Sequence, residues 1–242
     1  MKMNLYDYLA GNEYPGRGIC LGITPGGKAM IAYFIMGRSV NSRNRVFDPT
    51  PGGIRTKAAD PSKMTDPHLI IYNPVLTLGS TTIVTNGDQT NTIRDFMARN
   101  VFSGYGFEAA LATRTFEDDK PNWTPRISGL IDMRMSGYKL SILKSDDGDE
   151  KSVQRFTFDY SQPLAGVGHF ISTYKCNGNP IPSFAGEPLS VAMDEEDPDK
   201  YGAKLWKALN EDNKVSLFVR AIDLKTQKYK DVIINKYKAV EE

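Results

Sequence analysis

GICLGITPGGKAMIAYFIM, residues 18–36, contains two apolar runs separated by Pro25-Gly26-Gly27-Lys28. Because Pro followed by Gly favours a tight turn, this stretch predicts a β-hairpin near the start of the fold. Other apolar runs predict strands over 69–72, 81–85, 127–133, 138–143, 153–160, 169–174, 215–222 and 229–237, and periodic spacing predicts helices over 2–10, 90–99, 108–115 and 201–210. Strands outnumber helices, so the pattern predicts two stacked sheets with helices packed outside.

Two long segments rich in Pro, Gly and polar residues are predicted to be mostly loop. Residues 37–68 contain DPTPGG and ADPSKMTDPH, and residues 177–200 end in DEEDPDK. Loops of this length in a compact domain usually carry function. The sequence contains no internal repeat and no low-complexity linker, so we expect residues 1–242 to form one domain.

The charge balance and the lengths of the apolar runs indicate which classes of partner to expect. The 30 Lys and Arg residues nearly balance the 29 Asp and Glu residues, which gives a formal net charge of +1. A balanced chain exerts no long-range attraction on nucleic acid or on an anionic membrane, so we expect neither as a partner. No apolar stretch approaches the roughly 20 residues that span a bilayer. The scarcity of cysteine, with only Cys20 and Cys176, fits a reducing cytoplasm.

Metal and phosphate-loop motifs are absent from the sequence. His68 and His169 lie about a hundred residues apart, whereas zinc requires three or four ligands at motif spacing. Neither a GxxxxGK[ST] loop nor a GxGxxG loop between a strand and a helix occurs, and no GxSxG sequence is present. We therefore expect no metal site and no cofactor.

The segment GRSVNSRNR, residues 37–45, is the strongest candidate for anion binding. It carries Arg38, Arg43 and Arg45, and no acidic residue lies between Glu13 and Asp48. Guanidinium groups bind phosphate and carboxylate through paired hydrogen bonds, and the intervening Ser and Asn side chains add neutral donors. Taken alone, the segment fits either the wall of a small-molecule active site or a solvated basic loop.

Four further clusters are weak singly. TNGDQTNT (85–92) lies between a strand and a helix, where free backbone N–H groups bind anions, although a turn with a helix cap explains it equally well. NWTPRI (122–127), FISTY (170–174) and IIYN (70–73) each fit an ordinary structural strand.

Six motifs in a fixed order resemble the archaeal-type IMP cyclohydrolase family. They are YPGRGICLG (14–22), GRSVNSRNR (37–45), DPHLIIYN (66–73), TNGDQTNTI (85–93), FEDDKPNWTPRI (116–127) and HFISTY (169–174). The resemblance covers about residues 14 to 175 and fades after 180. It implies an α+β fold with four αββα layers, Ntn-hydrolase-like, in which two mostly antiparallel sheets lie between helices. It also implies a cyclohydrolase that closes a formamido-imidazole-carboxamide ribotide to IMP, with loss of water.

The resemblance suggests roles for residues in these motifs. We expect the 5′-phosphate to be bound by Arg17, Arg38 and Arg45, with Ser39 and Asn41 beside them, and the ribose or carboxamide by Asn73, Asn86 and Thr90. The substrate-binding set also includes Gly87 and Thr124. Candidate catalytic residues are Tyr72, Arg126, Tyr174 and Glu108, and Asp88 is a weaker candidate for acid–base catalysis.

Two other functions remain open at this point. A paralogue with the same fold could act as an amidohydrolase on another nucleotide-like substrate, as the divergent tail after residue 180 suggests. A nucleotide-binding protein without catalysis is the second alternative, because the sequence shows no strong acid–base pair. The sequence also leaves a homo-oligomer open.

Overall fold

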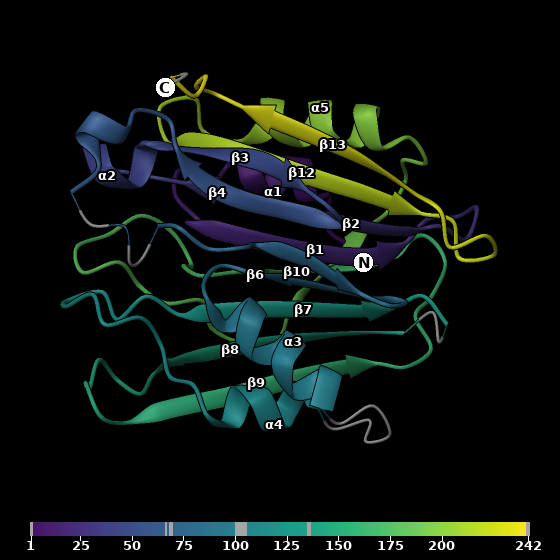
Figure 1. Ribbon diagram of the computed structural model, residues 1–242, viewed down its shortest axis with the longest axis horizontal. Helices are drawn as coiled ribbons and strands as arrows, with labels where there is room; N and C mark the ends of the chain where they lie inside the picture. The colour runs from purple at the N-terminus through teal and green to yellow at the C-terminus, as the bar shows by residue number, and fades with distance from the viewer. Residues whose placement is uncertain (1, 66, 68–69, 100–105, 135–136, 241–242) are drawn as a thin grey trace.

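The computed structural model describes residues 2–65, 67, 70–99, 106–134 and 137–240 (Figure 1). The strands of these residues form a six-stranded sheet and a seven-stranded sheet, in which every neighbouring pair is antiparallel. The helices outside the sheets are α1 (Leu5–Ala10), α2 (Val40–Arg43), α3 (Gln89–Arg99), α4 (Gly106–Ala112) and α5 (Pro198–Ala208), with a short 3-10 turn at Pro61–Lys63.

The six-stranded sheet has the order β11-β10-β1-β2-β12-β13. Its strands are β1 (Arg17–Ile23), β2 (Ala29–Met36), β10 (Val167–Ser172), β11 (Leu189–Ala192), β12 (Lys214–Ile222) and β13 (Tyr229–Asn235). The predicted hairpin is confirmed, because β1 pairs with β2 from Arg17 opposite Ile35 to Ile23 opposite Ala29.

The seven-stranded sheet follows the chain, with the order β3-β4-β5-β6-β7-β8-β9. Its strands are β3 (Arg45–Thr50), β4 (Gly53–Ala58), β5 (Val75–Leu78), β6 (Thr81–Thr85), β7 (Arg126–Asp132), β8 (Tyr138–Ser145) and β9 (Val153–Tyr160). The acidic run SDDGDE forms the predicted turn between β8 and β9.

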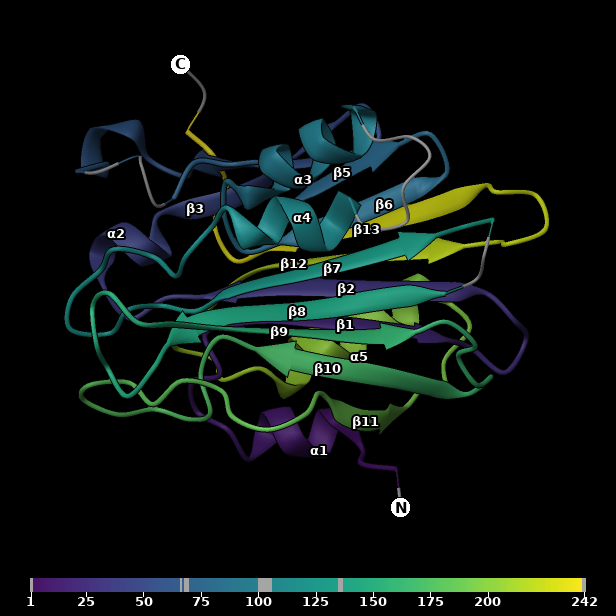
Figure 2. The same ribbon diagram turned by 90° about the horizontal axis from the view of Figure 1, so that it is seen from below.

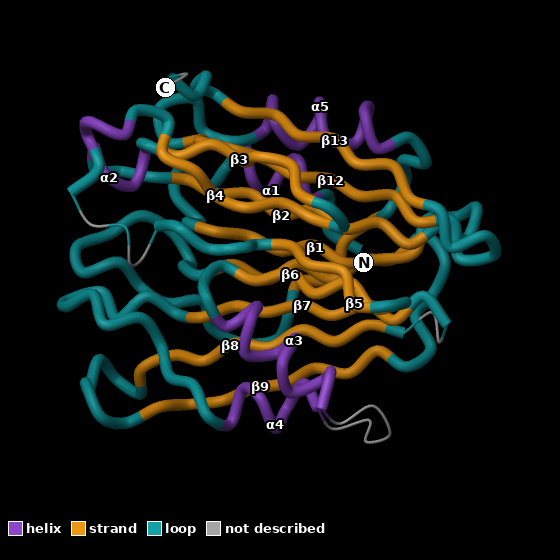
Figure 3. Tube along the Cα trace, viewed as in Figure 1, coloured by secondary structure: helices purple, strands orange, loops and turns teal. Residues whose placement is uncertain are grey.

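Side-chain alternation in β2 shows how the layers are built. Ile31, Tyr33 and Ile35 face the core between the two sheets, whereas Met30 and Phe34 face the core under α1 and α5. A third core lies between the seven-stranded sheet and helices α3 and α4. Figures 2 and 3 show α3 and α4 on one side of the strands, with α1 on the opposite side in Figure 2. The predicted αββα layering is therefore confirmed, and it is compatible with an Ntn-hydrolase-like arrangement.

The prediction that residues 37–68 are mostly loop is wrong. This segment contains α2 and the β3–β4 hairpin, whose strands pair from Arg45 opposite Ala58 to Thr50 opposite Gly53. Gly52 takes a positive φ of 76°, which the tight turn requires. Pro49 is tolerated because β3 is an edge strand, where a missing N–H leaves no gap in the ladder. His68, named above, lies outside the described residues.

Two smaller predictions also differ from the structure. Residues 70–72 form no strand, and the strand begins instead at Val75, after Pro74; Leu69 lies outside the described residues. The stretch 177–200 is not all loop, because it contains β11 and the first turn of α5.

No helix within the described part of the chain is long and apolar enough to cross a membrane.

Candidate active site

Two buried arginines begin strands in different sheets and point between them. Arg17 lies on the same face of β1 as Ile19, and Arg45 lies on the same face of β3 as Phe47; both apolar residues belong to the core between the sheets. Arg17 is 8% exposed and Arg45 is 0% exposed. We call these two residues the arginine pair.

Several guanidinium nitrogens of the arginine pair have no hydrogen-bond partner among the described residues. Arg45 Nε donates to the carbonyl of Ser42 at 2.8 Å, but neither terminal nitrogen of Arg45 has a hydrogen-bond partner among the described residues, and the same holds for Arg17 Nε. Burial lowers the pKa of Arg45, and the nearby charge of Arg17 lowers it further. Because unpartnered buried charge is unfavourable, this arrangement is suited to binding an anion.

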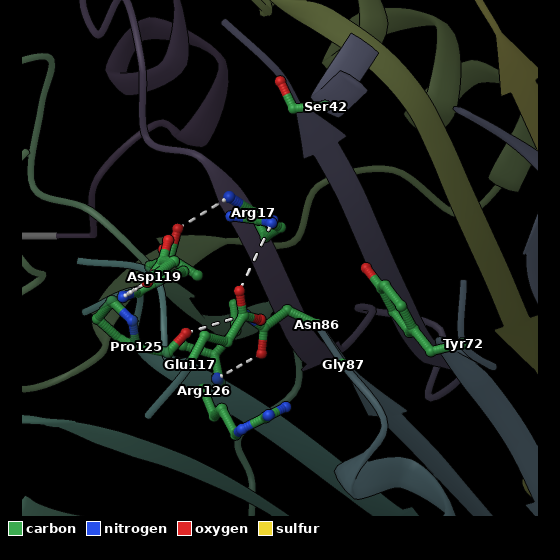
Figure 4. A network of polar contacts seen from close by, with 12 residues as sticks. Arg17, Ser42, Tyr72, Asn86, Gly87, Glu117, Asp119, Pro125 and Arg126 are labelled. Carbon is green, nitrogen blue, oxygen red and sulfur yellow. Dashed lines mark hydrogen bonds and ion pairs between the residues drawn. The ribbon is translucent and has the colours of Figure 1, made fainter. Parts of the chain in front are cut away.

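Tyr72 lies beside the arginine pair, on the segment between β4 and β5 (Figure 4). Its backbone is held by Thr56: Tyr72 N donates to Thr56 Oγ1 and Thr56 N donates to the Tyr72 carbonyl, both at 2.8 Å. Its hydroxyl lies 2.8 Å from that of Tyr33. Burial raises the pKa of Tyr72, whereas Arg45 and Arg17 act against that rise. Tyr72 is therefore a phenol at neutral pH and can donate a proton.

Glu117 supplies a buried carboxylate next to Arg17. It is 2% exposed, and its Oε2 lies 3.8 Å from Arg17 Nη2. Asn86 Nδ2 donates to Glu117 Oε1 at 3.3 Å (Figure 4). Burial raises the pKa of Glu117, although the positive charge of Arg17 opposes the rise. A carboxylate with a raised pKa is a suitable general base near neutral pH.

The amide of Asn86 is engaged by the protein at both ends. Its Oδ1 accepts from Ile127 N at 2.8 Å, and its Nδ2 also donates to the Pro125 carbonyl at 2.9 Å. Asn86 therefore fixes Glu117 relative to the start of β7 in this structure.

Arg126 is the first residue of β7, and its guanidinium lies against the start of α3. Its Nη1 donates to Asp88 Oδ1 and Gln89 Oε1, both at 2.8 Å. A Cβ atom at Gly87 would lie 2.5 Å from Arg126 Nη1 and 2.6 Å from Gln89 Oε1, so a side chain there would displace the ends of these two side chains. Gly87 therefore allows Arg126 to lie against the turn that precedes α3.

A second polar group joins Thr124 to Tyr174. Thr124 N donates to Asp119 Oδ1 at 2.6 Å, and the hydroxyls of Thr124 and Tyr174 lie 2.5 Å apart. The Tyr174 ring stacks on Tyr14 with centroids 5.9 Å apart, and the Arg38 guanidinium lies 5.1 Å from the centroid of Tyr14. Burial raises the pKa of Tyr174, and Arg17 opposes that rise. This stack leads from the buried site to an exposed arginine.

The structure brings part of the predicted set together and places the rest elsewhere. The residues in the region described above are Arg17, Arg45, Tyr72, Asn86, Gly87, Thr124, Arg126 and Tyr174. Glu108 lies on α4, in the outer helical layer, and pairs with Lys139 at 2.5 Å. Thr90 is the second residue of α3, and its hydroxyl lies 2.6 Å from that of Thr85, the last residue of β6.

The remaining predicted residues lie at the surface or beside the site. Arg38 is exposed, Ser39 accepts from Ser42 N as the cap of α2, and Asn41 is half-buried on α2. Asn73 is half-buried and follows Tyr72 directly. Within the described residues, no group of three or more His, Cys, Asp or Glu side chains is placed to hold a metal ion.

Sequence reasoning missed Glu117, Tyr33 and Asp119. Glu117 and Asp119 lie inside FEDDKPNWTPRI, a motif singled out above, but their burial cannot be read from an acidic loop. Tyr33 lies in the apolar run of β2, where an aromatic residue is expected as core. Its hydroxyl near Tyr72 follows only from the packing of the two sheets.

The comparisons with known proteins agree with one another. A family model described as IMP cyclohydrolase-like protein matches residues 14–228 and so extends well past the last of the six motifs. The chain is 26% identical over 188 residues to a protein of Methanococcus aeolicus named IMP cyclohydrolase, covering 77% of this chain and 84% of that protein. It is 29% identical over 197 residues to a protein of the same name from Methanococcus maripaludis, covering 77% and 90%.

Proposed function

We propose that this chain, which belongs to the family of IMP cyclohydrolase-like proteins, closes the ring of 5-formamidoimidazole-4-carboxamide ribotide to give IMP. The observation that carries this proposal is the buried Arg45, whose terminal nitrogens have no hydrogen-bond partner among the described residues. Tyr72 and Glu117 lie in the same site and supply an acid and a base. Residue types and burial together match the needs of an intramolecular condensation.

The reaction sets three requirements for the protein. The carboxamide nitrogen attacks the formyl carbon and loses one of its two protons, the formamide nitrogen loses its own proton, and the formyl oxygen leaves with both protons as water. Because both groups belong to one molecule, the protein must hold them in contact. It must also stabilise the negative charge that develops on the formyl oxygen, and it must move the protons.

We assign the formyl oxygen to Arg45 and Tyr72. Arg45 offers two terminal nitrogens that have no hydrogen-bond partner in the described part of the chain, and the fully buried position strengthens their attraction for a transient oxyanion. Tyr72 is protonated at neutral pH and can pass its proton to that oxygen. Glu117 accepts a proton from the attacking nitrogen, and Arg17 balances its charge before the transfer.

We assign the phosphate to the exposed end of the site. A phosphate dianion is strongly hydrated, so a partly solvated guanidinium holds it at a lower desolvation cost than a buried one. Arg38 is exposed, and its Nη1 donates to Asn177 Oδ1 at 2.6 Å and to the Gly178 carbonyl at 2.9 Å. Stacking of Arg38 on Tyr14 links this position to the buried residues.

Incubation of the purified chain with synthetic formamido ribotide tests the proposal. We expect the absorbance of IMP to appear at a rate proportional to protein concentration. Release of formate and the unformylated ribotide would instead identify an amidohydrolase, and chromatography separates these products. Binding of IMP by a folded chain that produces no IMP would identify a non-catalytic nucleotide-binding protein.

A further inference from the structure

Among the hydrogen bonds of the described residues, the Tyr72 hydroxyl has one partner, the Tyr33 hydroxyl of the six-stranded sheet. Tyr33 belongs to β2, its side chain is 0% exposed, and its ring stacks on Phe47 of β3 at 5.6 Å between centroids. Its hydroxyl lies 2.8 Å from the Tyr72 hydroxyl. Tyr33 therefore spans the core between the sheets and ends at the candidate acid.

Either hydroxyl can donate the hydrogen bond between Tyr33 and Tyr72, and both lie in buried, positively charged surroundings. Arg45 and Arg17 lie near both tyrosines and stabilise negative charge on either oxygen. Burial raises the pKa of both phenols, and it raises that of Tyr33 well above its ordinary value. Because a phenol has only one proton, a hydrogen bond from Tyr33 to the Tyr72 oxygen leaves the Tyr72 proton directed elsewhere.

We propose that Tyr33 is a positioning residue, which donates to the Tyr72 oxygen and so directs the Tyr72 proton toward the bound substrate. The inference rests on the proposed ring closure and deepens it. The backbone of Tyr72 is fixed by Thr56, and the hydroxyl end is fixed by Tyr33, so the phenol is held at both ends. When the Tyr72 proton passes to the formyl oxygen, the Tyr33 hydrogen bond stabilises the phenolate left behind.

Tyr33→Phe removes one oxygen and keeps the ring that stacks on Phe47. We expect kcat to fall about tenfold or more, with KM and the affinity for IMP changed by less than about twofold, because a hydrogen bond to a charged group acts mainly in the transition state. Tyr201→Phe is the matched control, since Tyr201 is equally buried but its hydroxyl contacts Cys20 Sγ, 3.5 Å away. The control should keep the wild-type kcat.

A double-mutant cycle separates positioning from general loss of structure. In a Tyr72→Phe background, Tyr33→Phe should cause no further fall in kcat, because the proton that Tyr33 directs is already missing. Equal falls in both backgrounds would overturn the proposal. Replacement Tyr33→4-aminophenylalanine restores a donor and should recover part of the rate, which also covers the case in which the phenylalanine variant folds poorly.

The outcomes for Tyr33 and for the proposed function are distinguishable. If the wild-type chain forms no IMP, the ring-closure proposal fails, and the role of Tyr33 fails with it. If the wild-type chain forms IMP and Tyr33→Phe matches it in kcat, only the positioning role is overturned. A fall in kcat that is matched by Tyr201→Phe would likewise overturn it.

Discussion

The Arg17 guanidinium lies 3.8 Å from the Glu117 carboxylate, and this contact joins the first strand of one sheet to the loop that enters β7 of the other. Glu117 balances one positive charge of the arginine pair and leaves that of Arg45 without a hydrogen-bonded acid among the described residues. The site therefore carries a local excess of positive charge, although the whole chain is nearly neutral.

Replacement of Arg45 should lower activity without lowering the stability of the fold. Arg45→Met removes a buried cation whose terminal nitrogens bond to none of the described residues, so we expect kcat to fall by about 10²–10³. The free energy of unfolding should stay equal or rise, by about 1 to 4 kcal/mol, because an apolar side chain of similar length removes the desolvation cost. Steady-state rates and urea unfolding measure the two effects.

Arg94→Met is the control for Arg45, because Arg94 is a half-buried arginine on α3, outside the site, that pairs with its neighbour Asp95. It should leave both kcat and stability close to wild type. A large loss of stability in Arg45→Met would contradict the interpretation of Arg45 as a functional rather than a structural cation.

Glu117 and Glu108 are the two candidate general bases, and the pH dependence of kcat in variants of each distinguishes them. Glu117→Gln should lower kcat by about 10²–10⁴ and remove the acidic limb of the kcat profile, because Glu117 must be ionised to accept a proton. In wild type, the fall of kcat on the acidic side should have its midpoint above the ordinary glutamate pKa, because burial raises the pKa of Glu117. Loss of activity in Glu108→Gln, with an intact rate in Glu117→Gln, would favour the carboxylate on α4 instead.

Asn86→Asp should shift the acidic-side fall of kcat to higher pH. The substitution places a second negative charge beside Glu117, where Asn86 Nδ2 now donates at 3.3 Å, and like charges raise the pKa of a carboxyl group. Asn4→Asp is a matched control, because the cap of α1 uses only the side-chain oxygen of Asn4. An unchanged limb in Asn86→Asp would show that Glu117 is not the titrating base.

The stability of the fold should decrease when His169 is protonated. His169 Nδ1 lies 2.6 Å from the Tyr138 hydroxyl, and burial lowers the pKa of His169 below 6.5. Between that lowered pKa and 6.5, the unfolded chain binds more protons, so the free energy of unfolding falls as pH falls. Its contribution is fully present above pH 6.5. Urea unfolding from pH 7.5 to 5 should show a steeper loss in wild type than in His169→Gln; parallel curves would contradict this.

Much of the layered fold was predictable because its signals are local. The two apolar runs in 18–36 and the Pro25-Gly26 turn between them specify the first hairpin without any knowledge of the other sheet. The β3–β4 hairpin was missed because Pro49 and Gly52 are typical of loops, and only the edge position of β3 makes them compatible with a strand.

The site was predictable only in part, because its chemistry depends on burial. Arg45 was found from an arginine cluster with no neighbouring acid, but its neighbours Arg38 and Arg43 point elsewhere, to Asn177 and Asn213. Glu117 reaches Arg17 across a hundred residues of chain, a contact that no local spacing encodes.

A structure of the chain with IMP bound is the most direct test of the account. We predict that the purine ring lies between the sheets, with the ring carbon that has lost the formyl oxygen facing Arg45 and the Tyr72 hydroxyl, Glu117 facing the newly formed ring, and the phosphate near Arg38. IMP bound at another surface, with the Arg45 terminal nitrogens still making no contact to it, would contradict the account.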